Sequence, residues 1–450
     1  MKRHQLDEAI MLLRFRVTNH RSIRDSIELT LTKSNFSAVR PSGGDWARAT
    51  NRVAGIFGPN GSGKTSLLDA MNFARMAIAN SATWSKRPEF PYRPFTLDDS
   101  SRGDTSAYEF DFVMSGVRHT YGFESSASGV TSEWLHSFPS GRRRTLFERD
   151  DDDIAFGRHL KGENARISRL MGPKNLFLST AALANHPQLT AVSRFLEFQF
   201  DYAVFSESNQ RQRVRAVKKW IDADSRILQK AQSLLRFADL GISRLTIEDV
   251  EVGKQWEKSF RKAMEVLSDE DEEGSPVKEE MIAEFLQEQR VQIGFWHQGK
   301  GSKGSYRLEI NDESSGTVAW LALAIPALRM IENGGTFIVD EIDASLHPRL
   351  TSALISLYKS PELNPKSAQL VFTSHDTSLM GHLVGETLDT EDIWFSEKRK
   401  DGATEIYALT EFPVKKDHNI ERRYLGGRYG AVPSVSWEEL QVSLLEGAAS

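Results

Sequence analysis

The 450 residues of the chain have an ordinary globular composition, with 39% hydrophobic and 26% charged side chains. This length allows two or three structural units. A formal net charge of -5 excludes a uniformly basic nucleic-acid coat. Because cysteine is absent, disulfides, thiolate metal sites and cysteine nucleophiles are excluded as well.

The N-terminal stretch through Phe15 begins with basic residues, but charges interrupt its apolar part and no small-residue cleavage site follows. No uncharged apolar run approaches the roughly 20 residues that a membrane-spanning helix needs. We therefore expect no signal peptide and no membrane contact. A cysteine-free chain of this kind fits a cytoplasmic location.

The first part of the chain shows strand patterns around one glycine-rich turn. Alternating apolar and polar residues between Leu12 and Thr32 predict two half-buried strands. A short apolar run at 53–57, the glycine-rich turn and helical spacing at 66–77 predict a strand, a phosphate loop and a helix. Further alternation from Tyr92 to Glu148 predicts an antiparallel sheet.

The pattern becomes mainly helical from 187 to 298, most clearly at 214–235 and 279–289. An acidic run at 269–273 interrupts it and predicts a solvated loop. Since no heptad pattern is sustained over several repeats, we expect no long coiled-coil arm. The sequence thus predicts a helical region inserted between two other parts.

Strand and helix alternate again after Tyr306. Apolar runs at 337–339 and 370–372 predict strands, and the spacing at 353–358 between them predicts a helix. This alternation is typical of an α/β core, so we assign the chain to the α/β class.

The segment from Gly58 to Thr65 has the spacing of a P-loop, in which backbone N–H groups surround phosphates at a helix N-terminus. Lys64 is expected to reach the β- and γ-phosphates, and the Thr65 hydroxyl to bind magnesium. The sequence therefore predicts ATP and Mg²⁺ as cofactors. The predicted nucleotide-binding residues of this loop are Gly58, Asn60, Gly61, Ser62, Gly63, Lys64, Thr65 and Ser66.

Two more apolar strands end in polar residues that suit the same chemistry. The strand at 336–339 is followed by Asp340 and Glu341, and the strand at 370–374 by His375. Parallel strands present their carboxyl ends to the ligand crevice. We predict that Asp340 holds the metal and that Glu341 orients or deprotonates the attacking water. His375, beside them, completes the predicted catalytic set of Lys64, Glu341 and His375.

These blocks resemble the ATPase heads of the ABC superfamily, in its SMC and RecF branch. The resemblance implies an ABC-type P-loop ATPase head with an antiparallel β subdomain and an inserted helical region. Residues 1–186 correspond to the N-terminal part of the head with Walker A and the β subdomain. Residues 187–300 are then the insertion, and residues 301–450 the C-terminal part with signature, Walker B, D-loop and switch histidine.

Further sites follow from this resemblance. The segment 313–317, Glu-Ser-Ser-Gly-Thr, resembles a degenerate signature, which implies that Ser315 and Gly316 of one head contact the ATP held by another. The segment 344–347 matches the D-loop position. Arg21, within a segment that resembles the Asn-Phe-Arg-Ser element, is expected near the nucleotide, with a surface ion pair as the alternative. No glutamine stands where the Q-loop residue is usual, so that residue is unassigned.

More narrowly, the chain is similar to the RloA-like ATPases of anti-phage and abortive-infection loci, related to the ATPase subunits of PARIS and Septu. The blocks that carry this likeness include 93–95 and 424–430. It implies an ATP-sandwich homodimer or higher oligomer that controls a separately encoded effector, expected to be a nuclease. Nucleic acid stays open as a partner, through basic residues at 142–144 and 211–219. The alternatives are a DNA-repair or chromosome-maintenance ATPase and an ATP-bound scaffold without turnover.

Overall fold

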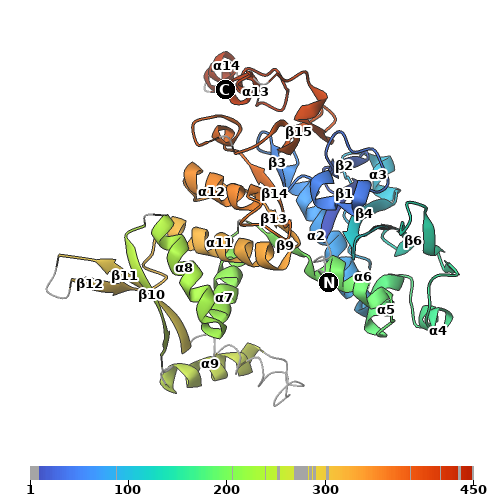
Figure 1. Cartoon of the computed structure of the whole chain (residues 1–450), viewed down its shortest axis with the longest axis horizontal. Helices are drawn as coiled ribbons and strands as arrows, with labels where there is room; N and C mark the ends of the chain where they lie inside the picture. The colour runs from blue at the N-terminus through green and yellow to red at the C-terminus, as the bar shows by residue number, and fades with distance from the viewer. Residues whose placement is uncertain are drawn as a thin grey trace. The chain divides into compact units, whose positions relative to one another are not determined.

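The computed structural model describes residues 10–87, 89–204, 206–238, 240–250, 254–267, 282, 286, 290–300, 304–385, 387–415, 417–433 and 437–447. The chain forms two compact units (Figure 1). The first comprises Met1–Ala203, Met330–Asp343 and Thr351–Ser450, and the second Val204–Arg329 and Ala344–Leu350. The acidic run at 269–273 and nearly all of the predicted helix at 279–289 lie outside the described residues.

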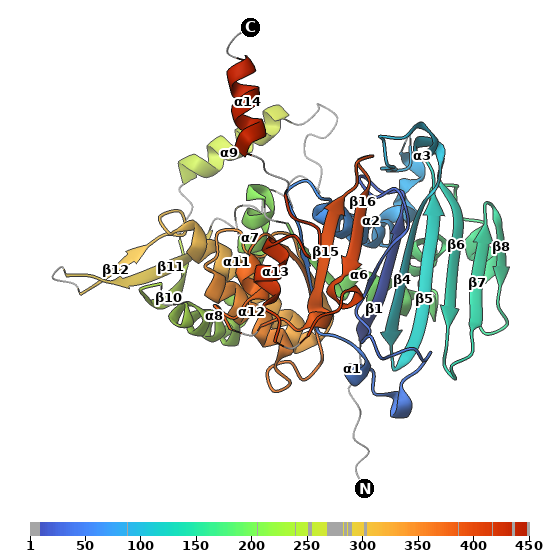
Figure 2. The ribbon, with the colours of Figure 1, turned by 90° about the horizontal axis from the view of Figure 1, so that it is seen from above.

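The first unit contains a seven-stranded antiparallel sheet, whose strands β1 and β4 to β8 lie side by side in Figure 2. In β1 the side chains of Leu13, Phe15 and Val17 are buried, whereas Arg14 and Arg16 between them pair with acidic side chains. This period of two confirms the predicted half-buried strands and the antiparallel sheet. The strand order is β2 (Ile27–Thr30), β1 (Met11–Thr18), β4 (Ser106–Met114), β5 (Val117–Ser125), β6 (Val130–Ser137), β7 (Arg144–Asp150) and β8 (Asp153–Phe156).

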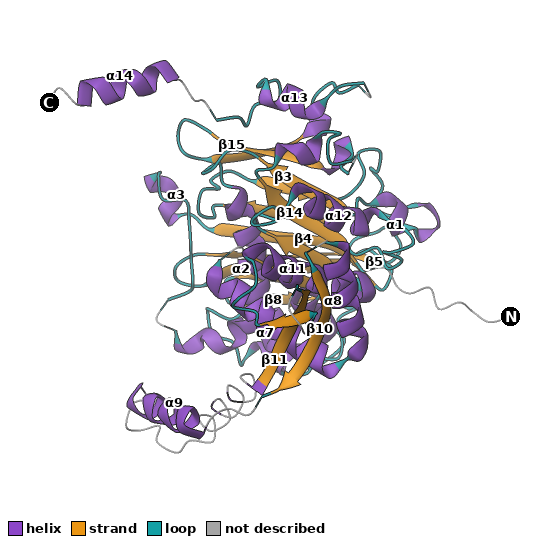
Figure 3. Ribbon diagram, turned by 90° about the vertical axis from the view of Figure 1, so that its left-hand side faces the viewer, coloured by secondary structure: helices purple, strands orange, loops and turns teal. Residues whose placement is uncertain are grey.

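A second sheet of the same unit has six strands, and Figure 3 shows β15, β3 and β14 as neighbours in it. All pairs are parallel except that of β15 with the edge strand β16. The strands β3, β13 and β14 are buried along their whole length, as expected for parallel strands with continuous apolar runs. The order is β16 (Thr404–Ala408), β15 (Ile393–Lys398), β3 (Val53–Phe57), β14 (Gln369–Ser374), β13 (Thr336–Val339) and β9 (Phe200–Ala203).

The core of the first unit joins both sheets through α2 (Lys64–Asn80). Leu67 and Met71 of this helix belong to one buried cluster with Phe15 of the first sheet and with Ile56 and Val371 of the second. Each such side chain contributes about 1.5–3 kcal/mol when it is buried. The α/β class predicted from the sequence is confirmed. The remaining helices of this unit are α1 (Trp46–Ala49), α3 (Asp99–Gly103), α4 (Asn164–Ser168), α5 (Phe177–Leu183), α6 (Leu189–Phe198), most of α12 (Pro348–Lys359), α13 (Ile420–Leu425), α14 (Trp437–Gly447), and the 3-10 helices η1 (Ser42–Gly44), η2 (Ser81–Lys86), η4 (Thr377–Met380), η5 (Thr390–Asp392) and η6 (Leu409–Glu411).

The second unit contains helices and a small sheet. Helices dominate the described residues of 187–298, as the sequence predicts, but β10 (Ile242–Asp249), β11 (Val291–Gln298) and β12 (Ser305–Leu308) form a three-stranded antiparallel sheet that was not predicted. Leu245 and Phe295 are buried in the two longer strands. The helices of the unit are α7 (Glu207–Ala223), α8 (Ser225–Phe237), α9 (Lys254–Leu267) and most of α11 (Ser315–Asn333).

The block at 424–430, which the sequence left without a role, packs on the edge of the six-stranded sheet. The rings of Tyr424 and Tyr429 both stack on Phe395 of β15, with centroids 5.2 and 5.7 Å away. The Tyr407 hydroxyl of β16 donates to the carbonyl of Tyr429 at 2.8 Å. Gly430 has φ of 67°, and a β-carbon there would meet the Tyr407 hydroxyl. The block therefore holds the β15–β16 hairpin in place.

Candidate nucleotide site

The P-loop connects β3 to α2, as the sequence predicts. Three of its glycines have positive φ: Gly58 at 156°, Gly61 at 77° and Gly63 at 104°. A β-carbon on Gly58 would collide with the backbone oxygen of Ser396, and one on Gly63 with the side chain of Thr404. Glycine is therefore required at Gly58 and Gly63 by both conformation and space.

Lys64 begins α2 and folds back over the loop. Its ammonium donates to the carbonyls of Gly58 and Pro59 at 2.6 and 3.0 Å and lies 3.4 Å from Nδ1 of His375. Burial lowers the pKa of Lys64 to about 8, although Asp340 and Glu341 oppose the shift. A bound phosphate would favour the charged form again, so the side chain suits an anionic ligand.

Thr65 and Asp340 meet at the place where a metal is expected. The Thr65 hydroxyl donates to Oδ1 of Asp340 at 3.2 Å, and the Thr373 hydroxyl donates to the same oxygen at 2.6 Å. Asp340 is 5% exposed. A hydroxyl and a buried carboxylate are oxygen ligands of the kind that Mg²⁺ prefers beside phosphates. These two residues therefore fit the predicted metal role.

Glu341 and His375 lie next to this pair. Glu341 has φ of 55°, and its backbone N–H donates to the Thr373 hydroxyl at 2.7 Å. This turn places Oε1 of Glu341 3.7 Å from Nε2 of His375. The carboxylate is 45% exposed and is thus accessible to water, as a general base must be.

Lys64, Thr65, Glu341 and His375 line one cavity of about 760 Å³ in the first unit. That volume lies within the usual range for small-molecule sites, about 300–1,000 Å³. The Ser62 hydroxyl is buried in the loop and finds no hydrogen-bond partner among the described residues, as expected where a ligand supplies one. The lining residues are Ser22, Asn60, Gly61, Ser62, Gly63, Lys64, Thr65, Ser66, Glu341, His375 and Lys398.

Arg21 does not line this cavity. Its Nε atom pairs with Oδ2 of Asp69 on α2 at 3.1 Å, so the structure shows the ion pair that the sequence left as the alternative. Asp69 also accepts a bond from Nε2 of the buried His20 at 2.9 Å and pairs with Arg93. Burial lowers the pKa of His20, which keeps this imidazole neutral. His20 and Arg21 thus hold α2 through Asp69, and the residue after Arg21, Ser22, lines the cavity.

The predicted signature lies at the start of α11 in the second unit. The Ser314 side chain accepts a bond from the Thr317 N–H at 3.1 Å and so caps this helix ahead of Ser315 and Gly316. A β-carbon on Gly316 would lie 3.1 Å from the carbonyl of Ser345, which belongs to the predicted D-loop. Signature and D-loop therefore touch within the second unit.

Sequence reasoning missed three groups around the cavity. Ser22 and Lys398 line it, and the Thr404 hydroxyl lies 2.9 Å from the carbonyl of Ser62. For Lys398 a weaker signal existed, because it ends the strand β15, whose apolar residues 393–395 precede it by three positions, and strand ends of this sheet face the cavity. Ser22 ends the segment that resembles the Asn-Phe-Arg-Ser element, but the role was assigned to Arg21. Thr404 gave no signal, since its place depends on pairing between distant parts of the chain.

The sheet and the cavity define a P-loop nucleotide-binding protein. Residues 53–158 and 193–381 match the profile of a family described as "AAA domain, putative AbiEii toxin, Type IV TA system". That match covers more than half of the chain, so the protein belongs to this AAA-domain family. No curated protein matches the sequence.

Solved structures similar to the chain include two SMC head domains and the recombination mediator protein RecF. An SMC head domain from Thermotoga maritima has 15% identity and a TM-score of 0.40, covering 90% of this chain and 99% of its own. An Smc head with an extended coiled coil, bound to the C-terminal domain of ScpA derived from Pyrococcus furiosus, has 14% identity and a TM-score of 0.38, covering 89% and 97%. RecF with ATP has 12% identity and a TM-score of 0.35, covering 90% and 100%.

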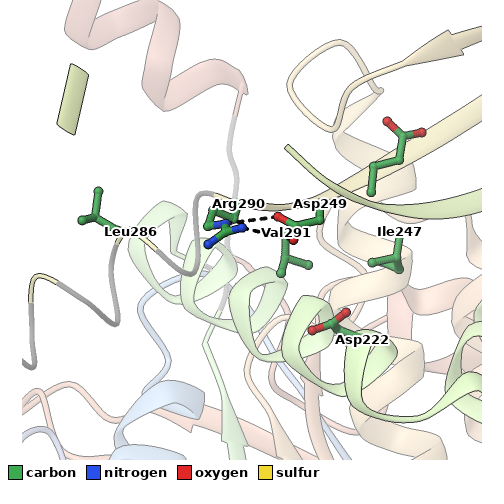
Figure 4. A pocket seen from close by; sticks show the side chains of 7 residues that line it. Asp222, Ile247, Asp249, Leu286, Arg290 and Val291 are labelled. Carbon is green, nitrogen blue, oxygen red and sulfur yellow. Dashed lines mark hydrogen bonds and ion pairs between the residues drawn. The ribbon is translucent and has the colours of Figure 1, made fainter. Parts of the chain in front are cut away.

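A second cavity, of about 450 Å³, lies in the second unit. Figure 4 shows Asp222, Asp249 and Arg290 in its wall, with Arg290 bonded to Asp249. Its remaining lining residues are Ile247, Glu248, Leu286 and Val291, and none of them is a phosphate-binding group of the P-loop kind.

None of the described helices combines the length and the apolar content needed to cross a bilayer.

Proposed function

We propose that the protein is an ATP-binding and ATP-hydrolysing switch. One observation carries the proposal: Lys64, Thr65, Glu341 and His375 line a single cavity, and Thr65 is bonded to Asp340. These residues come from three parts of the sequence and are brought together at the carboxyl ends of β3, β13 and β14. A P-loop with a strand-end carboxylate pair is the arrangement that phosphoryl transfer requires.

In the proposed reaction the loop N–H groups and Lys64 hold the phosphates, and Lys64 offsets the charge that develops on them. Mg²⁺, held by Thr65 and Asp340, adds further neutralisation when it is bound. Glu341 orients the attacking water and accepts its proton, and His375 lies 3.7 Å from that carboxylate.

The proposed active form is a dimer that sandwiches ATP between two copies. Ser315 and Gly316 stand at the N-terminus of α11, where free N–H groups and the helix dipole favour an anion. In this arrangement they contact the ATP held by the P-loop of the other copy. ATP binding closes the dimer and hydrolysis opens it, which makes the second unit the part that transmits the change.

The proposed cellular role is that of the ATPase subunit in a bacterial anti-phage system, acting on a separate effector nuclease. The family description, which names a putative AbiEii toxin and a type IV toxin–antitoxin system, supports a defence setting. The RloA-like blocks at 93–95 and 424–430 support it too. The second of these is the block that holds the β15–β16 hairpin.

The decisive experiment compares wild type with Lys64→Ala and Glu341→Gln in ATP binding, phosphate release and molecular mass with ATP and Mg²⁺. We expect Lys64→Ala to lose about 100-fold or more in hydrolysis. We expect Glu341→Gln to bind ATP normally, to lose about 10²–10⁴-fold in hydrolysis and to accumulate as an ATP-bound dimer. Lys400→Ala and Glu362→Gln, exposed residues away from the cavity, are the matched controls.

Other outcomes separate the alternatives. Wild type that binds ATP but neither hydrolyses it nor changes its mass would replace the switch with an ATP-bound scaffold. Strong stimulation of hydrolysis by DNA would favour the repair or chromosome-maintenance role over the defence role.

A further inference from the structure

We propose that Lys398 is a second phosphate-binding cation of the nucleotide site and holds the phosphates nearest the nucleoside. The inference rests on the proposed ATP-binding function and deepens it. Lys398 lines the same cavity as the P-loop but comes from the edge of the sheet, at the end of β15.

The position of Lys398 follows from the pairing of β15 with β3. These strands are parallel, with Phe395 beside Phe57, the residue before the P-loop. β15 continues to Lys398 and so runs on alongside the loop. Because side chains alternate along a strand, Lys398 shares its face with Ser396, whose hydroxyl donates to the carbonyl of Ser62 at 3.2 Å. Lys398 is thus on the face that meets the loop.

Its neighbours on the hairpin have other partners. Glu397 accepts bonds from the Tyr407 hydroxyl at 3.1 Å and from the Ala431 N–H at 3.2 Å. Arg399 pairs with Asp25 and Glu405. The Lys398 ammonium, by contrast, makes no hydrogen bond or ion pair within the described part of the chain. It is a cation at a phosphate cavity with its donors unused.

A row of hydroxyls leads from the cross-strand partner of Lys398 to Ser66 of the P-loop helix. Thr404, the cross-strand partner of Lys398, has its hydroxyl 2.8 Å from that of Ser22, which in turn donates to the hydroxyl of Ser66 at 2.8 Å. Ser66 follows Thr65 on α2. The catalytic carboxylate Glu341 is not part of this row. Since Lys64 serves the β- and γ-phosphates, a cation beside Ser22 and Ser66 suits the α- and β-phosphates.

This location gives the block at 424–430 a functional purpose. The stacked rings of Tyr424 and Tyr429 fix Phe395, three residues before Lys398. The block thereby sets the position of the strand end from which Lys398 enters the cavity.

The test measures ADP and ATP affinity calorimetrically for the full chain, with Lys398→Met, Lys398→Arg and Lys400→Met as a matched control from the same hairpin. Charge-assisted hydrogen bonds are among the stronger ones, so we expect Lys398→Met to weaken ADP and ATP binding alike, by about tenfold. KM should rise by a similar factor with kcat nearly unchanged. Lys398→Arg should restore most of the affinity, and Lys400→Met should bind as wild type does.

Either of two results would overturn the assignment: ADP affinity of Lys398→Met within twofold of wild type, or a loss confined to ATP, which would move the contact to the γ-phosphate. Because ADP binding requires no turnover, the result can be read even if the protein does not hydrolyse ATP. Failure of wild type to bind either nucleotide would instead refute the proposed function itself.

Discussion

The nucleotide cavity of the first unit and the signature segment of the second are built in different ways. The cavity gathers side chains from Ser22 to Lys398, and most of them lie at the carboxyl ends of β3, β13, β14 and β15, which pair in parallel in one sheet. The signature segment is held by near neighbours, namely its own cap at Ser314 and the carbonyl of Ser345, and by the bond of Glu313 to His297 at 2.6 Å. The first unit thus contains the proposed phosphate site, whereas the second contributes the N-terminus of α11. In the proposed dimer, ATP binding would belong to one chain and hydrolysis to a pair.

The largest expected effect tests that division directly. Ser315→Arg replaces the hydroxyl at the start of α11 and should abolish the contact of that α11 with the ATP held by a second copy. We expect hydrolysis to fall by about 100-fold, as for loss of one transition-state donor, while ATP affinity stays within twofold of wild type. Phosphate release and calorimetry measure the two quantities. Ser208→Arg, an exposed change in the same unit, is the control.

Mixing two inactive variants tests whether each catalytic site is shared between two chains. In a mixed dimer of Lys64→Ala and Ser315→Arg, one of the two sites has an intact P-loop facing an intact signature. Equal mixing should restore about a quarter of the wild-type rate, because half of random dimers are mixed and each has one working site. If the mixture stays as inactive as its components, the two-chain site is refuted.

A smaller effect concerns the protonation of Lys64. Burial lowers the pKa of this ammonium to about 8 in the free protein, and a bound phosphate requires its charged form. ATP affinity should therefore be nearly constant below pH 7 and fall by about tenfold between pH 7 and pH 9, as the proton is lost before binding. The affinity for ADP is measured over the same pH range. An affinity that does not change over this range would show that Lys64 keeps its proton in the free site.

The smallest effect is expected at Arg21. Because its guanidinium is 44% exposed and pairs with Asp69 outside the cavity, it contributes no more than a partly exposed ion pair does. Arg21→Ala should change ATP affinity by less than about fivefold, the equivalent of 1 kcal/mol. A loss as large as that of Lys64→Ala would return Arg21 to the nucleotide site.

Much of the cavity could be predicted from the sequence because its residues follow local rules. Gly58 to Thr65 have a recognisable spacing, and Asp340, Glu341 and His375 each follow a short apolar strand. Parallel strands place such positions at one edge, so the sequence was sufficient to bring them together. The assigned roles of these residues stay predictions until hydrolysis is measured.

The rest depended on long-range pairing that carries little local signal. Ser22 and Thr404 are neighbours only because β15 joins β3 and β16 then turns back beside it. The three-stranded sheet of the second unit was missed because the helical spacing around it dominated the pattern. Local spacing likewise could not show that Arg21 pairs with Asp69 on α2, and its role at the nucleotide stays a prediction. The divisions at 187 and 300 also stay predictions, although α6 and β9 lie in the first unit.

The position of β3 between two strands from the late part of the sequence bears on how the protein is synthesised. β3 is flanked on both sides by strands that lie more than 300 residues later in the chain, β14 and β15. A nascent chain that has exposed its P-loop therefore lacks both neighbours of that strand until the ribosome has made most of the polypeptide. ATP should be captured only after translation is nearly finished, so a truncated product would not compete for nucleotide.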